Sequence, residues 1–159
     1  MTAVVIVLLF VASAVAAAVV VVRTNKRKFA EANVIVPGTA TRAPAEWAGA
    51  HTPEARMHRR LRDAVAALRA NPAMEDAFMM DARVSLEQQA LVVDERLIAV
   101  AALPEPVRAQ PLASVATAVD AVEAAVAAFA VGPEAGSGLE RAMADVADRV
   151  AQLKQGGTI

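Results

Sequence analysis

The chain has 159 residues, room for about one domain, and aromatic residues make up only 3% of it, so any core must be built largely from alanine, valine and leucine. It contains no cysteine, which excludes disulfides, zinc–thiolate sites, iron–sulfur clusters and a cysteine nucleophile. The net charge of −1 provides no overall field that would attract nucleic acid.

The chain begins with an apolar segment. Every residue in 3–22 is apolar except Ser13, and none is charged. About 20 helical residues cross the hydrocarbon core of a bilayer, so this run predicts an N-terminal transmembrane helix. A cleaved signal peptide is the rival interpretation, because 12–14 offers a small-residue cleavage pattern. Residues 1–2 carry no basic side chain, however, and the run is longer than the apolar part of a usual signal peptide.

Four basic residues follow the apolar run: Arg23, Lys26, Arg27 and Lys28. By the positive-inside rule they predict a single-pass protein of the plasma membrane, with its N-terminus outside and the rest in the cytoplasm. The same cluster attracts anionic lipid headgroups at about 1 kcal/mol per charge. A topology determinant without a specific lipid is the alternative interpretation. We take 1–28 as the anchor with its basic flank.

Residues 29–51 show no helical period and predict an extended linker that contains proline and glycine. Trp47, the only tryptophan, lies in this linker. It is either a docking anchor or membrane-interface residue, or it folds back and caps the helical domain.

Amphipathic helices are predicted from Thr52 onward. Thr52 is a hydroxyl cap with a proline and an acid after it, and the helix that it begins ends at Asn71. A second helix is expected over 72–103, long enough that it either projects beyond its neighbours or breaks near Ser85. The apolar stripes of these two helices are Met57, Leu61, Ala64, Val65 and Leu68, then Leu86, Ala90, Val93, Leu97 and Val100.

The third helix is expected over 112–131, after a rigid proline-rich connector over 104–111. A capping box of Ser137 and Glu140 predicts the start of a fourth helix. The apolar stripes of these helices are Leu112, Val115, Val119, Val122, Val126 and Phe129, then Leu139, Met143, Val146, Val150 and Leu153.

Four amphipathic helices with short connections predict an all-α fold: an antiparallel bundle of about four helices over 52–154, with a tail at 155–159. The alternative is that one or two of the stripes are buried only when a partner binds.

Residues that could carry chemistry are few. His51, Glu54 and His58 can be drawn as a weak divalent-metal site, but the histidines lie two turns or about 10 Å apart, and a solvated helix start is the ordinary interpretation. The sequence has no glycine-rich phosphate loop, no G-x-S-x-G and no HExxH, and the apolar segment has no ionisable residue. We therefore expect no catalysis, no cofactor, no metal and no small-molecule substrate.

The first predicted cytoplasmic helix carries five basic residues: Arg56, His58, Arg59, Arg60 and Arg62. They could bind anionic lipid or an acidic protein surface, whereas nucleic acid is disfavoured because aromatic stacking residues are missing. The alternative is ion pairing of at least half of the arginines with the acidic second helix. Arg59 and Arg60 are expected to remain free.

The Val/Ala anchor, the basic cluster at 23–28, the proline-containing lead to Trp47 and the Arg-rich and then Ala-rich helices resemble the small single-pass accessory subunits of actinobacterial respiratory complexes, notably the cytochrome bc–oxidase supercomplexes. The resemblance covers most of the chain as architecture. It implies no cofactor in this subunit and a role in assembly, stability or association of the larger complex.

Three functions follow as hypotheses. The first is an accessory subunit that stabilises a multisubunit membrane complex by binding other membrane-protein subunits. The second is a membrane-tethered cytoplasmic adaptor in cell-envelope, division or secretion processes, and the third is an enzyme or metal-binding protein that uses His51, Glu54 and His58. The predicted membrane or partner interface consists of Phe10, Ser13, Val20, Arg23, Lys26, Arg27, Lys28, Trp47, Arg59 and Arg60.

Overall fold

The computed structural model describes residues 33–71, 77–131 and 136–156. The predicted anchor over 1–28 therefore lies outside the described residues, as does the beginning of the predicted linker. The described residues form one 3-10 helix and four α-helices, with no strand. These elements are η1 (Ala45–Ala48), α2 (Pro53–Arg69), α3 (Ala77–Ala101), α4 (Glu105–Val131) and α5 (Gly136–Gln155).

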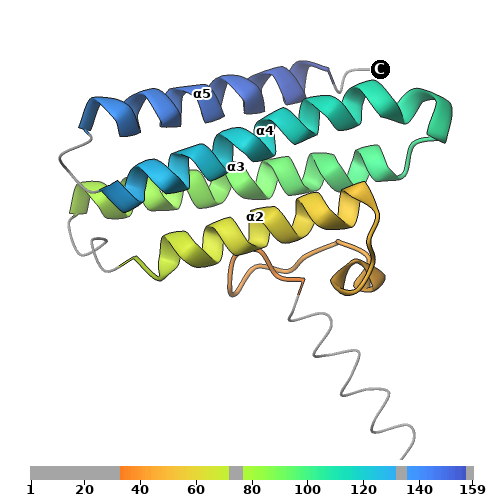
Figure 1. Ribbon diagram of the computed structural model, residues 1–159, viewed down its shortest axis with the longest axis horizontal. Helices are drawn as coiled ribbons and strands as arrows, with labels where there is room; N and C mark the ends of the chain where they lie inside the picture. Colours follow the sequence, from red (N-terminus) through yellow and green to blue (C-terminus); the bar gives the residue numbers. More distant parts are fainter. Residues whose placement is uncertain (1–32, 72–76, 132–135, 157–159) are drawn as a thin grey trace, which may run out of the picture. The chain divides into compact units, whose positions relative to one another are not determined.

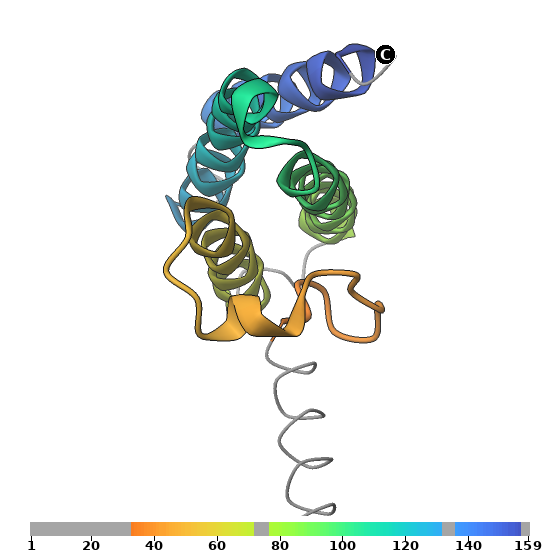
Figure 2. The same cartoon turned by 90° about the vertical axis from the view of Figure 1, so that its right-hand side faces the viewer.

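The four α-helices alternate in direction along the chain, so α2 and α4 run one way while α3 and α5 run the other (Figure 1). α3 and α4 each pack against all three other helices. In the view along the helices, α2 and α5 lie on opposite sides of the α3–α4 pair (Figure 2). The prediction of an all-α bundle of about four helices is confirmed for the described residues.

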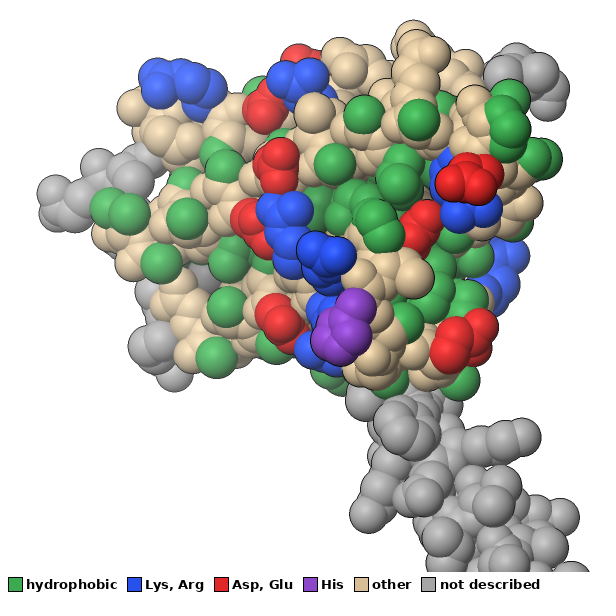
Figure 3. All heavy atoms as spheres, turned by 45° about the vertical axis from the view of Figure 1, so that its right-hand side comes forward, with side chains coloured by type: hydrophobic (Ala, Val, Ile, Leu, Met, Phe, Trp, Pro, Cys, Tyr) green, Lys and Arg blue, Asp and Glu red, His purple; other side chains and the backbone are tan. Residues whose placement is uncertain are grey.

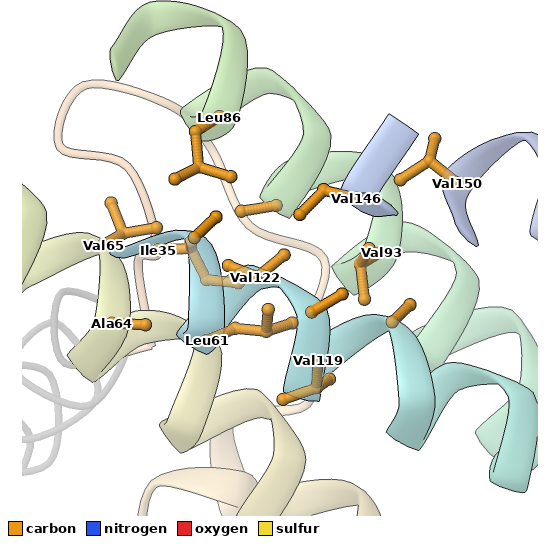
Figure 4. Close-up of a cluster of buried hydrophobic side chains, with 14 of the residues drawn as sticks. Ile35, Leu61, Ala64, Val65, Leu86, Val93, Val119, Val122, Val146 and Val150 are labelled. Carbon is orange, nitrogen blue, oxygen red and sulfur yellow. The ribbon is translucent and has the colours of Figure 1, made fainter. Parts of the chain in front are cut away.

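The core lies where the apolar stripes of the four helices meet. Leu61 of α2, Val93 of α3 and Val122 of α4 are completely buried and point toward one another (Figure 4). Val146 of α5 is also completely buried and belongs to the same cluster. Phe129 is the largest of the fully buried side chains, so the packing depends on many small contacts more than on a few large side chains.

α2 begins as predicted. The Thr52 hydroxyl accepts a hydrogen bond from the backbone N–H of Ala55 (3.3 Å), which satisfies one of the free amides at the helix start. Pro53 follows at the first helical position, where its missing N–H costs nothing. The helix ends at Arg69.

α3 is one continuous helix through Ser85, so it does not break there. The five stripe residues predicted for it, Leu86, Ala90, Val93, Leu97 and Val100, are all completely buried. Residues 72–76, where this helix was expected to begin, lie outside the described residues.

α4 differs from the prediction, because it begins at Glu105 and includes part of the expected connector. Pro111 lies inside it and leaves the carbonyl of Val107 without its helical N–H donor. This turn is open to water, since the Val107 side chain is 57% exposed. The Arg108 guanidinium also donates two hydrogen bonds to the carbonyl of Leu103 (3.0 and 2.7 Å), which holds the chain where it enters the helix.

The predicted start of α5 is also wrong in detail. Ser137 lies inside the helix, which includes Gly136, so it does not act as the residue before the first turn. The predicted stripe is nevertheless correct. Leu139, Val146, Val150 and Leu153 are buried, and the fifth predicted residue, Met143, is half-buried against the core. The helix ends at Gln155.

Candidate functional site

Residues 33–52, here called the strap, are folded against the bundle and do not form an extended linker. Ile35, Val36 and Trp47 of the strap are buried with the core. In Figure 2 the strap crosses the side of α2 and α3 that faces away from α5. The linker prediction is therefore wrong for the described part, because three apolar side chains spaced along an irregular segment are enough to bury it.

One histidine joins the strap to two helices. The imidazole of His58 in α2 is completely buried. Its Nδ1 lies 2.6 Å from Oδ1 of Asp94 in α3, and its Nε2 lies 3.0 Å from the backbone carbonyl of Asn33 in the strap. Only 6% of the Asp94 side chain is exposed, so this contact is shielded from water.

Trp47 packs beside this pair. Its ring meets the His58 ring edge to face, with the centroids 5.5 Å apart, and only 7% of the residue is exposed. Of the two interpretations of Trp47, the structure shows the one in which it folds back onto the helical domain. It is not available as an exposed anchor in this structure.

Arg59 of α2 holds the C-terminal part of the strap through hydrogen bonds. Its Nη1 donates to the carbonyls of Trp47 (2.8 Å) and Ala50 (2.7 Å). The prediction that Arg59 stays free is therefore wrong, because the turn at η1 directs two backbone carbonyls toward it. A guanidinium with several N–H groups is well suited to bind two acceptors at once.

Arg60 is not free either. Its guanidinium donates to Asp120 (2.6 Å) and to Glu123 (2.8 Å through Nε) on α4. The hydrogen bonds to Glu123 and then to Asp120 raise the pKa of Arg60 above its usual value. The prediction placed the partners of these arginines on the acidic second helix, whereas Arg60 pairs with two acidic side chains of α4.

The proposed triad of His51, Glu54 and His58 is not assembled. Both ring nitrogens of His58 are engaged elsewhere, and His51 is exposed. Glu54 is instead paired with Arg108 of α4 (3.2 Å). Burial alone raises the pKa of Glu54, but hydrogen bonds from its own backbone, Arg108 and Thr52 outweigh this and lower it below 4.5. No group of three or more potential metal ligands occurs among the described residues.

A groove of about 760 Å³ lies between the C-terminal halves of α2 and α4. Its floor is apolar and consists mainly of small side chains: Ala64, Ala67, Leu68, Ala70, Val126, Ala127 and Ala130. Arg60, Asp63 and Glu123 contribute the charges in its lining. The face drawn in Figure 3 carries acidic and basic side chains next to one another, with hydrophobic ones between them.

α4 is long and apolar enough to cross a membrane by length and composition alone. It also packs against α2, α3 and α5, and its Asp120 and Glu123 pair with Arg60. A core helix of a bundle passes the same length and composition test. The packing of α4 against three helices and the ion pairs of its Asp120 and Glu123 are expected of a core helix in a bundle. Placing ionised side chains in the hydrocarbon of a membrane would instead cost free energy.

Seven residues of the predicted interface lie outside the described residues: Phe10, Ser13, Val20, Arg23, Lys26, Arg27 and Lys28. The other three, Trp47, Arg59 and Arg60, lie on α2 or the strap and make contacts within the chain. Asn33 and Asp94, which complete the junction with His58, were not predicted. No protein-family model, curated protein or solved structure matches the chain.

Proposed function

We propose that this chain is a non-catalytic accessory subunit that stabilises a multisubunit membrane complex. In this proposal, 3–22 is the transmembrane anchor, the basic cluster at 23–28 meets anionic headgroups, and the bundle lies in the cytoplasm at the membrane surface. The resemblance to accessory subunits of respiratory supercomplexes makes such a supercomplex the first one to test.

The observation that carries the proposal is the number of residues between the apolar run and the first residue of the strap that is bound to the bundle. If 29–51 were an extended linker, the basic cluster and linker together would leave 29 residues, 23–51, to act as a tether. Because the strap is bound from Asn33 onward, at most ten residues, 23–32, remain. Ten residues span at most about 35 Å when fully extended.

A short tether suits a bracing subunit better than an adaptor that reaches into the cytoplasm. It keeps the bundle at high effective concentration beside whatever membrane protein the anchor contacts. The anchor itself is rich in small side chains, which allow close approach of neighbouring transmembrane helices. Both features favour a permanent neighbour in the same membrane.

The direct test is purification of the tagged full-length chain from its native membranes in a gentle detergent, with quantitative mass spectrometry and an absorption spectrum. Other membrane subunits at near-equal stoichiometry support the proposal, and haem bands among them identify a respiratory complex. Recovery of the chain alone contradicts it.

A matched variant tests the role of the tether. Insertion of about 20 Gly/Ser residues after Lys28 lets the bundle move away without changing the anchor or the folded strap. The proposal predicts that this variant loses co-purifying subunits, whereas an insertion of the same length after Gly156, beyond α5, has no effect. Equal recovery with both insertions would instead favour the tethered adaptor.

A further inference from the structure

The His58 ring has an acceptor at each nitrogen. The partner at Nε2 is the carbonyl of Asn33, which can only accept, and the partner at Nδ1 is the carboxyl group of Asp94, which can only accept when it is ionised. With Asp94 ionised, both bonds can therefore form together only when the ring carries a hydrogen on each nitrogen. The docked strap thus needs the imidazolium form of His58 opposite ionised Asp94.

Loss of one proton changes this junction locally. A neutral imidazole has one N–H and one lone pair, so it can donate to Asp94 or to Asn33 but not to both. The Asp94 contact joins two helices, and the Asn33 contact holds the strap. When the remaining hydrogen points at the carboxylate, a nitrogen lone pair faces the Asn33 carbonyl and repels it.

We propose that the strap is a proton-dependent latch: it is docked on α2 and α3 while His58 is doubly protonated and is released when the ring becomes neutral. Release exposes Trp47, Ile35 and Val36 together with the α2–α3 surface that they cover. Loss of a hydrogen bond to a charged group weakens the docking equilibrium by roughly tenfold or more.

Several other charged groups of the strap, α2, α3 and α4 are paired with one another, while Glu46 and His51 of the strap also carry titratable side chains. Arg42 of the strap meets Glu95 of α3 (3.2 Å), and Arg59 binds strap carbonyls. On the α4 side, Glu54 meets Arg108, and Arg60 meets Asp120 and Glu123. Asp94 is the one ionisable side chain hydrogen-bonded to the His58 ring, so these two groups control the latch.

Release also lengthens the tether. If 23–32 is the tether of the proposed function, release adds 33–51 to it, and its maximum length grows from ten to 29 residues, roughly threefold. This consequence rests on the proposed function, but the latch itself does not.

The fluorescence of Trp47 can report whether the strap is docked, because Trp47 is the only tryptophan in the sequence and its ring lies against His58. The experiment follows its emission and its quenching by acrylamide in the full-length protein in detergent, from about pH 5 to about pH 9, a range that brackets the ordinary titration of imidazole near 6.5. We expect the emission to move to longer wavelength and the quenching to increase as the pH rises, while the helical circular dichroism stays constant.

The chain offers a matched control. His51→Gln removes the exposed histidine and should leave the pH response unchanged, whereas His58→Gln should abolish it. If His58→Gln does not fold, Asp94→Asn serves instead, because an amide can either accept from or donate to Nδ1, so both ring contacts can form in either protonation state and the pH response should flatten. A flat wild-type response, or a response removed by His51→Gln, overturns the proposal.

Discussion

The helix pair α2–α3 and the helix pair α4–α5 bury different kinds of side chains. The buried residues of α4 and α5 are all valine, alanine, leucine or phenylalanine. α2 and α3 also bury ionisable side chains, namely Glu54, His58, Glu87 and Asp94. His58 and Asp94 belong to the junction with the strap, where an irregular segment needs directional contacts to fix its position. Glu54 and Glu87 instead form ion pairs between helices, with Arg108 of α4 and Arg69 of α2.

The largest effect is expected at the polar junction. His58→Ala leaves Asp94 buried without its partner, and breaking a buried pair in this way costs about 3–5 kcal/mol. Urea unfolding followed by circular dichroism measures the loss. The double variant His58→Leu/Asp94→Leu should recover most of it, because neither charge then needs a partner. A single-variant loss below about 1 kcal/mol would show that the pair is solvated.

The stability of the apolar half, α4 and α5, should depend on the volume of the buried side chains and not on charge. Ala125 of α4 is completely buried, so Ala125→Leu inserts three carbon atoms into packed space and should cost about 1–3 kcal/mol of unfolding free energy. Ala127→Leu in the open α2–α4 groove is the matched control and should be close to neutral. The same loss at both positions would contradict the assigned packing.

Arg59→Ala should loosen the strap without unfolding the bundle. It removes two charge-assisted hydrogen bonds to strap carbonyls, which lowers the local stability of the strap by about 1–2 kcal/mol. Acrylamide quenching of Trp47 measures this directly. Arg149→Ala is the control, since Arg149 pairs with Asp145 within α5, and the strap crosses the side of α2 and α3 that faces away from α5 (Figure 2).

The smallest effect concerns Glu54. Its pKa is lowered in the folded state, so its contribution is present above the unfolded pKa near 4.5 and is lost as the pH falls through the folded value. Glu54→Gln should cost about 1 kcal/mol at neutral pH and nothing in strong acid. Unfolding midpoints at the two pH values measure the difference. An equal loss at both would rule out the ionised carboxylate as its source.

The helices could be predicted from the sequence because their evidence is local. The heptad-like spacing of Leu86, Val93 and Val100 marks a face that must be buried, whatever it packs against. Pro111 misled the prediction, because proline normally ends a helix and only the water-exposed turn around it permits continuation.

The junction could not be predicted in the same way, because Asp94 is 36 residues from His58 and Asn33 is 25 residues away on the other side. One feature of the sequence did indicate that His58 would be buried. His58 lies three residues before Leu61 and seven before Val65, so it shares their buried stripe. A polar residue on such a stripe must find a partner, although the sequence alone does not say which one.

The central claim is that the strap is part of the folded bundle. Hydrogen–deuterium exchange of the full-length protein in detergent tests it most directly, at the amides of Trp47, Gly49 and Ala50, which donate to the carbonyls of Pro44 and Glu46. We expect these amides to be protected at about pH 6 to a degree comparable with the ends of α2. Exchange of 33–52 at the rate of an unstructured chain, while the helices stay protected, would contradict it.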